Sequence, residues 1–284
     1  MINSPCQHEM NIEELQATFI SLRECWNVQW PGLPAVMTTC LLRLGHQSPF
    51  LMAPNTQSIH DCIQVVAQLI EQDGQVRASL NQEPAYHNRL HVANTLVALT
   101  TLLLLQRQFC GDTRSVPSHT EWMAMLTMVS HDLLHDGSVN IQKSQIEARS
   151  AQHLEPLMNE FGVTQSDQHI IKTIILSTDP TLVKACHEII KNRPFCIEDV
   201  DCLTVLIQEA DIMASTMPDV GPLLTKQLAC EWSKTNCPGV HALNTLSGRI
   251  EFLRNGALFS SPASQLLGVD AVKAAQLLEL GANV

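Results

Sequence analysis

The chain has 284 residues and a formal net charge of −11 at pH 7. It has no cluster of Lys and Arg, which argues against a nucleic-acid partner. Aromatic residues make up only 4% of the sequence. Leu, Ala, Gln and Met are frequent, so the composition favours helices over sheet.

Helix signals follow one another along the chain, and no strand is strongly indicated. Prolines in residues 31–54 separate an N-terminal helical piece from the main body. Ser118 and Glu121 form a capping box, and Gly137 is a helix stop. Helices are predicted at residues 59–70, 85–109, 122–135, 147–161, 166–176, 199–215, 222–232 and 242–253, with two short ones beginning at residues 261 and 269.

These signals predict an all-α, multi-helix bundle. Residues 1–55 form an N-terminal helical extension and residues 56–284 the main domain. The extension either packs on the main domain or mediates contacts in a homodimer, and the sequence leaves both open.

No part of the chain predicts a membrane partner. Residues 1–16 are polar and lack the apolar core of a signal peptide. Residues 96–105 are the most apolar run, but they are too few to span a bilayer and indicate a buried helix. The 10 cysteines include no Cys-x-x-Cys pair, and scattered reduced thiols predict a cytoplasmic protein.

Two histidine pairs are the most informative feature of the sequence: His87 with His91, and His131 with His135. Residues four apart lie on one face of a helix, so each pair is expected to aim both imidazoles at one point. Asp132 would then point about 100° away and bridge towards a second metal.

Other polar residues complete a possible metal site. Asp211 lies in an apolar helix, where a carboxylate needs a partner or a metal. Asp179 ends a helix and either holds metal-bound water or serves as a turn residue. Asp136 and Asn140 are candidates too, with loop chemistry near Gly137 as the alternative. His and Asp together are typical ligands of hydrolytic metal sites.

The motifs Tyr86-His87-Asn88-x-x-His91 and His131-Asp132-x-x-His135-x-Gly137-x-x-Asn140 resemble the two signature motifs of class I 3′,5′-cyclic-nucleotide phosphodiesterases. That family is a branch of the HD-domain metal phosphohydrolases. Thr178-Asp179 and Ala210-Asp211 follow in the family's order, and the resemblance covers roughly residues 60–270. It implies an HD-domain, phosphodiesterase-like helical bundle.

The resemblance also implies roles. The protein ligands of the tighter metal, usually zinc, would be His91, His131, Asp132 and Asp211. Asp132 would also bridge to a second metal, usually magnesium or manganese. His87 would be the general acid, supported by Tyr86 and Asn88, and His135 and Asp179 would surround the metal-bound waters. Asn140 closes the second motif, and Glu147 is the nearest candidate for a further acidic residue near the second metal.

Two departures from the family concern Asp136 and the base pocket. Asp136 replaces a proline after the second motif's last His, which adds a charge near the site. The family reads the base with a Gln followed three residues later by a Phe. Gln265 is a possible counterpart, but no Phe follows it, and its segment also fits a plain amphipathic helix capped before Pro262.

These features predict metal-dependent hydrolysis of a 3′,5′-cyclic nucleotide, cyclic AMP or cyclic GMP, to the 5′-nucleotide. A hydroxide bridging two metals would attack phosphorus, and His87 would protonate the leaving oxygen. Three alternatives stay open: an HD phosphohydrolase acting on another nucleotide, a di-iron oxygenase, and a metal-stabilised module that binds a nucleotide or a protein without turnover.

Overall fold

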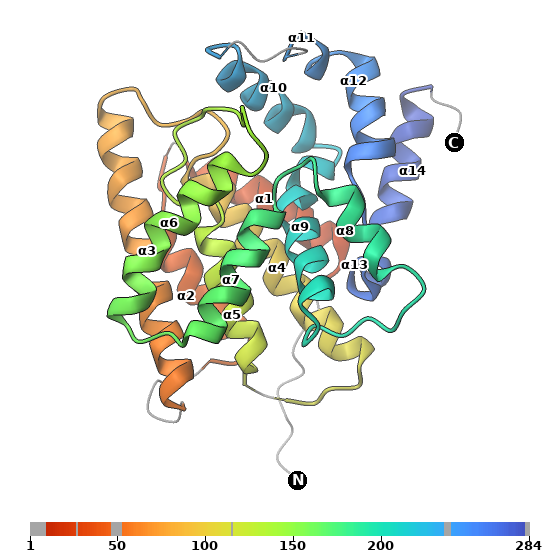
Figure 1. Ribbon diagram of the computed structural model, residues 1–284. Helices are drawn as coiled ribbons and strands as arrows, with labels where there is room; N and C mark the ends of the chain where they lie inside the picture. Colours follow the sequence, from red (N-terminus) through yellow and green to blue (C-terminus); the bar gives the residue numbers. More distant parts are fainter. Residues whose placement is uncertain (1–9, 27, 47–52, 115, 236–239, 282–284) are drawn as a thin grey trace.

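The computed structural model describes residues 10–26, 28–46, 53–114, 116–235 and 240–281. Within these ranges every regular element is a helix and no strand occurs, which confirms the predicted all-α, multi-helix fold (Figure 1).

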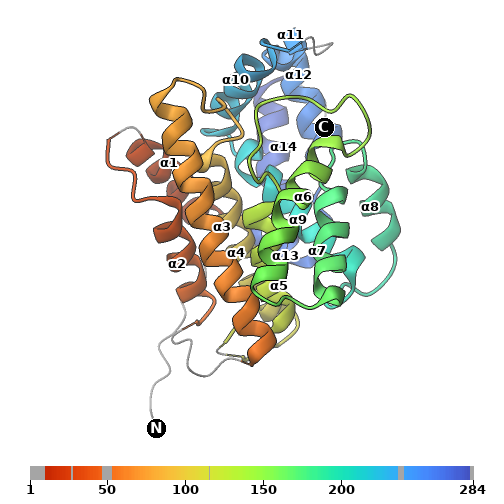
Figure 2. The same ribbon diagram turned by 60° about the vertical axis from the view of Figure 1, so that its left-hand side comes forward.

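Helix α4 lies at the centre of the bundle (Figures 1 and 2). It spans Arg89–Phe109 and is the one described helix long and apolar enough to cross a membrane, yet 94% of its apolar stretch is buried. It is therefore the core helix that residues 96–105 predicted. The helices packed against it are α1 (Ile12–Trp26), α2 (Leu33–Arg43), α5 (His119–Ser130), α9 (Val200–Thr216) and α13 (Pro262–Leu267).

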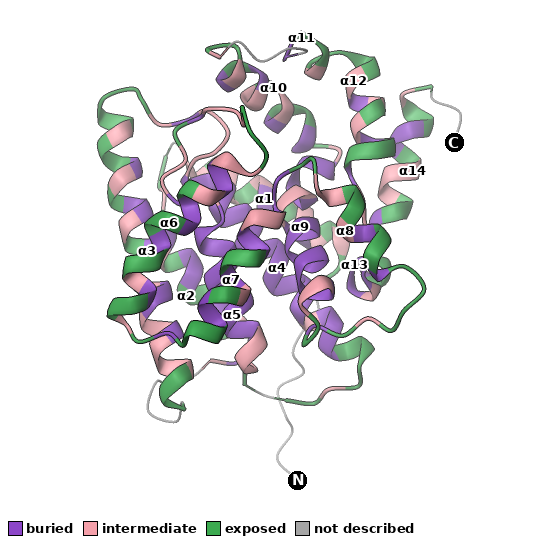
Figure 3. Cartoon of the chain, in the orientation of Figure 1, coloured by how far each residue is buried: buried purple, intermediate pink, exposed green. Residues whose placement is uncertain are grey.

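Helices α1 and α2 share one hydrophobic core with α4. Leu15, Phe19 and Leu33 are fully buried in the same cluster as Leu96 and Leu99. Figure 3 shows this buried interior running through the middle of the bundle. The N-terminal helices therefore lie on the body of the molecule.

Helix α3 (Pro54–Ser79) ties the N-terminal helices to α4 through Glu71. This buried carboxylate accepts hydrogen bonds from the Leu33 backbone N–H at 2.7 Å and from Trp30 Nε1 at 3.0 Å. It also pairs with Arg89, in the first turn of α4. A buried charge needs such partners, because desolvation without them is costly.

The other helices flank this centre. Helices α6 and α7 pack together beside α3 and α5, α8 packs on α9, and α14 follows α13 (Figures 1 and 2). Their bounds are α6 (Gln145–Glu160), α7 (Gln165–Ser177), α8 (Val183–Ile190), α10 (Gly221–Trp232), α11 (Val240–Leu243), α12 (Leu246–Glu251), the π-helical turn η2 (Phe252–Gly256) and α14 (Val269–Glu279).

The helices predicted from the sequence differ from those of the structure in three places. The short helix α8 was missed, and the segment predicted as one helix at 242–253 is divided into α11, α12 and the start of η2. The helix predicted to reach His135 ends at Ser130. The capping box of Ser118 and Glu121 at the start of that helix is confirmed.

Candidate active site

Four of the predicted site residues meet at one point between α4, α5 and α9. His91 Nε2 lies 3.2 Å from Asp132 Oδ2 and 3.2 Å from Asp211 Oδ1. His131 Nε2 lies 3.2 Å and 3.5 Å from the same two oxygens. We call His91, His131, Asp132 and Asp211 the central cluster.

Helix termini place the two histidines of the central cluster. His91 lies in the first turn of α4, where Asn88 is the N-cap and its side chain accepts hydrogen bonds from the Leu90 and His91 N–H groups. This satisfies two of the N–H groups that a helix start leaves unpaired. The supporting residue Asn88 therefore fixes the position of His91 through the backbone.

The backbone leaves the helix at the second motif, which corrects the expected geometry. His131 follows the last residue of α5, and Leu134 adopts a left-handed conformation with φ of 60°. His131 and His135 therefore do not share a helix face. Asp132 turns inwards beside His131 instead of pointing about 100° away, so the geometric argument for Asp132 was wrong.

The first pair also fails to lie on one helix, because His87 precedes the N-cap of α4. The four histidines pair crosswise, one from each motif. His91 faces His131 with 5.6 Å between ring centroids, and His87 stacks on His135 at 4.0 Å. His87 and His91 also lie close together, with 5.6 Å between ring centroids, although they do not share a helix. The expectation that each pair converges through a shared helix face was therefore wrong.

Burial and the charges of neighbouring members shift the pKa values of all four residues of the central cluster. Burial alone would lower the pKa of His91, but hydrogen bonds and charge from Asp132 and Asp211 outweigh it and raise that pKa to about 9. His131 behaves in the same way. Although burial opposes the effect, His131 holds the pKa of both Asp132 and Asp211 below the usual range.

The donor set of the central cluster fits a divalent cation. Apart from its contacts with Asp132 and Asp211, Nε2 of His131 has no polar partner among the described residues, while its Nδ1 lies 2.7 Å from the Met128 carbonyl oxygen. A carbonyl that accepts from Nδ1–H leaves Nε2 as a free ligand atom. The ligand atoms of His91, His131 and Asp211 all lie within 4.8 Å of one another. Two imidazoles and two carboxylates suit zinc, manganese and related ions.

A second group lies beside the first and joins His87, His135 and Glu231. Glu231, from α10, hydrogen-bonds Nδ1 of His87 and accepts from the backbone N–H groups of Tyr86 and His87. His135 accepts from the Gly137 N–H through Nδ1, and burial, together with the charge of His87, lowers its pKa to about 4. The three ligand atoms of this group lie within 4.8 Å of one another, so it too could hold a metal ion.

A pocket of about 330 Å³ opens beside both groups, with His87, Tyr86 and Asp211 in its wall. The remaining wall is largely apolar and comes from α9, α10, α12 and η2, including Ile212, Leu228, Trp232, Arg249 and Phe252. Tyr86 closes the inner end, since its hydroxyl lies 3.0 Å from Ser215 Oγ and its ring is 4.8 Å from that of His91. We call this space the cluster pocket.

The remaining acidic candidates form a neighbouring network. Asn140 donates to both oxygens of Glu147, at 3.1 and 2.9 Å. Burial, aided by the charges of Asp179 and Asp132, raises the pKa of Glu147. Asp179 accepts from the Ser144 and Thr181 backbone N–H groups. The structure thus places Asp179 as a turn residue whose charge still acts on Glu147.

Two further sequence candidates lie away from the cluster pocket. Asp136 is half exposed and pairs with Arg149 at 3.3 Å, so it faces solvent. Gln265 is exposed on α13 and lines a different pocket. Gln265 therefore does not line the cluster pocket, and its position on α13 fits the alternative interpretation of this segment as a plain amphipathic helix.

Sequence reasoning missed Glu231 and Phe252. Neither has a partner at helical spacing in the motifs, and each reaches the site only because its helix folds back over α9. The one local signal was Glu231 in the otherwise apolar segment before Trp232, where a carboxylate needs a partner.

No protein-family model and no curated protein matches this chain.

Proposed function

We propose that the protein is a metal-dependent phosphohydrolase that cleaves a phosphodiester, with 3′,5′-cyclic nucleotides as its substrates. The observation that carries the proposal is the position of His87. Its ring is 5.6 Å from that of the ligand candidate His91, and both His87 and Asp211 line the cluster pocket.

The central cluster would hold the metal. His91, His131, Asp132 and Asp211 offer two nitrogens and two carboxylates, and a shared cation would replace the direct contacts of His131 Nε2 with Asp132 and Asp211. Bound divalent ions would supply positive charge for the phosphate and would acidify water. This matters in a chain with a net charge of −11, which would otherwise repel an anionic substrate.

His87 has the surroundings of a proton donor. Glu231 engages Nδ1 and so directs Nε2 towards the cluster pocket. A carboxylate at Nδ1 fixes the orientation of the ring. His87 would give its proton to the oxygen that leaves phosphorus, which is O3′ in a 3′,5′-cyclic nucleotide. The product would then be the 5′-monophosphate.

The cluster pocket supports a nucleotide as the substrate. Its apolar wall, with Trp232 and Phe252, can bury a flat base. Gln208 offers a polar contact, because its Oε1 has no hydrogen-bond partner among the described residues. Because Gln265 lies outside this pocket, we base the substrate class on the apolar wall and the phosphate chemistry of the metal cluster.

The test is conversion of cyclic AMP and cyclic GMP to 5′-monophosphates by purified protein with added manganese or magnesium. Asp132→Ala should lose both bound metal and turnover. His87→Ala should retain the metal but lose at least about a hundredfold in rate, a typical contribution of a general acid. His153→Ala, at an exposed position on α6, is the matched histidine control.

Three outcomes separate the hypotheses. Unchanged turnover in His87→Ala would reject His87 as the acid. Metal binding without hydrolysis of either cyclic nucleotide would reject the substrate class, and a panel of other nucleotides would follow. Dependence on iron and oxygen would favour the oxygenase instead.

A further inference from the structure

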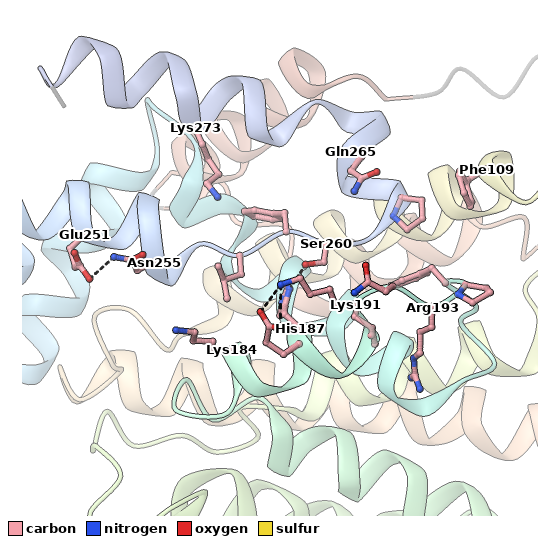
Figure 4. A pocket seen from close by; sticks show the side chains of 18 residues that line it. Phe109, Lys184, His187, Lys191, Arg193, Glu251, Asn255, Ser260, Gln265 and Lys273 are labelled. Atoms are coloured by element: carbon pink, nitrogen blue, oxygen red, sulfur yellow. Dashed lines mark hydrogen bonds and ion pairs between the residues drawn. The ribbon is translucent and has the colours of Figure 1, made fainter. Parts of the chain in front are cut away.

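A larger pocket, of about 1030 Å³, lies on the other side of η2 from the centre of the molecule (Figure 4). Its wall comes from α8, α13, α14 and the segment after η2. Figure 4 shows Lys273 and Gln265 reaching into it from one side, and Lys184 and His187 of α8 from the other. We call it the α8–α14 pocket.

Positive charge gathers in this pocket although the chain is acidic. Four basic side chains line it against two acidic ones, Glu188 and Glu251. Lys191 and Arg193 are already paired, with Glu188 and with Asp199 and Asp201. The two remaining basic residues, Lys184 and Lys273, supply the charge that is open to a ligand.

Lys273 and Lys184 have no strong carboxylate partner. Lys273 Nζ donates to the Ala257 carbonyl oxygen at 2.5 Å, and its nearest carboxylate, the exposed Asp270, is 3.8 Å away. Burial lowers the pKa of Lys273. The side chain of Lys184 makes no hydrogen bond or ion pair with any residue in the described part of the chain. Lys184 is exposed, so water hydrates its charge, whereas Lys273 is partly buried and would gain more from an anion in the pocket.

His187 is buried, and one of its two ring nitrogens has no hydrogen-bond partner among the described residues. It is only 7% exposed, its Nδ1 lies 2.7 Å from Ser260 Oγ, and its Nε2 has no hydrogen bond among the described residues. When Ser260 donates to Nδ1, the ring hydrogen lies on Nε2 and can be given to an acceptor. Among the described residues, this is the one buried polar side-chain atom without a hydrogen-bond partner that belongs to a residue lining this pocket.

The rest of the wall can hold a flat, partly polar group. Phe109, Phe195 and Phe259 line the pocket, together with the amides of Asn255 and Gln265. Aromatic faces stack on heterocyclic bases, and amides offer both donors and acceptors to their edges. A volume of this size accommodates a drug-sized ligand.

We propose that the α8–α14 pocket binds a nucleoside monophosphate, with the phosphate at Lys184, Lys273 and His187 and the base against the phenylalanine side chains. This site is separate from the metal cluster and does not depend on the proposed hydrolysis. It adjoins the cluster pocket, because Lys184, Asn255 and Leu258 line both.

The test is calorimetric titration of the full chain with adenosine 5′-monophosphate in the presence of EDTA. Chelation removes the cations that would hold phosphate at the acidic central cluster, so binding there is suppressed. Lys273→Gln and His187→Phe are the informative variants, because these residues line only the α8–α14 pocket. Each should weaken binding about tenfold, as expected for loss of a hydrogen bond to a charged group.

Matched controls separate this site from general charge effects. Lys226→Gln makes the same charge change at an exposed position of α10 that lines neither pocket, and it should leave the affinity unchanged. Ribose 5-phosphate should bind more weakly than the nucleotide, and adenosine more weakly still.

Hydrogen exchange of the wild-type protein provides a measurement that needs no variant. The nucleotide should slow exchange in residues 184–195 and 255–265. Absence of binding at millimolar nucleotide, or binding that neither variant weakens, would overturn the proposal. Protection confined to residues 86–91 and 208–215 would also overturn it, since the ligand would then occupy the cluster pocket.

Discussion

At the scale of single residues, the site depends on one carboxylate that the motifs do not contain. Glu231 accepts from two backbone N–H groups and binds the His87 ring. Burial would raise its pKa, but the hydrogen bond and charge of His87 lower it on balance. Glu231 thus remains ionised beside the proposed acid and holds its orientation.

Glu231→Gln should therefore lower the rate while leaving bound metal unchanged. The amide keeps the side-chain volume but weakens the charged hydrogen bond that orients His87, and the expected loss is about 10- to 100-fold in kcat. Steady-state kinetics with metal analysis checks this. Glu121→Gln, which disrupts a buried pair with Arg107 away from the site, should cost stability but not rate per bound metal. A full rate in Glu231→Gln would contradict the orienting role.

Asp211→Asn tests the central cluster without reference to turnover. The neutral amide is a weaker ligand, so manganese should raise the melting temperature of the wild-type chain but hardly that of the variant. A ligand at a thousand times its Kd stabilises a folded protein by about 4 kcal/mol. Asp219→Asn, at an exposed position, should retain the full metal-induced shift. Equal shifts in all three proteins would place the metal elsewhere.

At the scale of elements, the sequence predicted helices well and their ends poorly. Apolar periodicity located α4 and α9, and the capping box located the start of α5. The start of α4 and the segment after α5 position the site residues, however. Their geometry depends on the backbone conformations of Asn88 and Leu134. A left-handed leucine carries no sequence signal, since the favoured residues there are Gly and Asn.

The candidate site was predictable in its membership more than in its geometry. Residue types and spacing pointed to the histidine pairs and Asp211, and the family resemblance implied the four members of the central cluster, which the structure brings together. The crosswise pairing of histidines was not predictable, because it arises from tertiary packing of two helix ends. Glu231 and the wall of the cluster pocket come from α10, α12 and η2, far along the chain from either motif.

Helix α3 offers a prediction for the junction between the N-terminal helices and α4. Burial would raise the pKa of Glu71, but hydrogen bonds from Leu33, Trp30 and Arg89 bring it below the ordinary 4.5. The folded state therefore favours the ionised form. This contribution to stability is complete above about pH 4.5 and is lost as the pH falls further.

Glu71→Gln should lower the free energy of unfolding by about 3 kcal/mol at pH 7, because it leaves Arg89 with one fewer buried carboxylate. Urea denaturation at pH 7 and at pH 4 checks the size and the sign: the difference from the wild-type chain should shrink at the lower pH. Glu155→Gln, at an exposed position of α6, should change stability by less than about 0.5 kcal/mol. A constant difference across this range would show that the pKa of Glu71 is the same in the folded and unfolded chains, which would contradict the effect of its hydrogen bonds.

At the scale of the whole molecule, the central helix α4 joins the N-terminal helices to the central cluster. One end of α4 carries His91, and its length packs on α1, α2 and α9 within a single hydrophobic cluster. A substitution that destabilises α1 should therefore also destabilise the site. If residues 10–46 formed an independent unit, a substitution in α1 would leave the stability of the site unchanged.

Phe19→Ala distinguishes these two cases. Phe19 is fully buried, and removing such a ring costs about 3–5 kcal/mol through lost burial and the cavity left behind. Coupling predicts one unfolding transition, shifted to lower temperature, with helicity and the fluorescence of the buried Trp122 changing together. Phe109→Ala, at a side chain that is 54% exposed, should shift the transition little. An early partial transition in Phe19→Ala, with metal-induced stabilisation unchanged in the remainder, would instead mean that the N-terminal helices melt alone and that α4 holds the site without them.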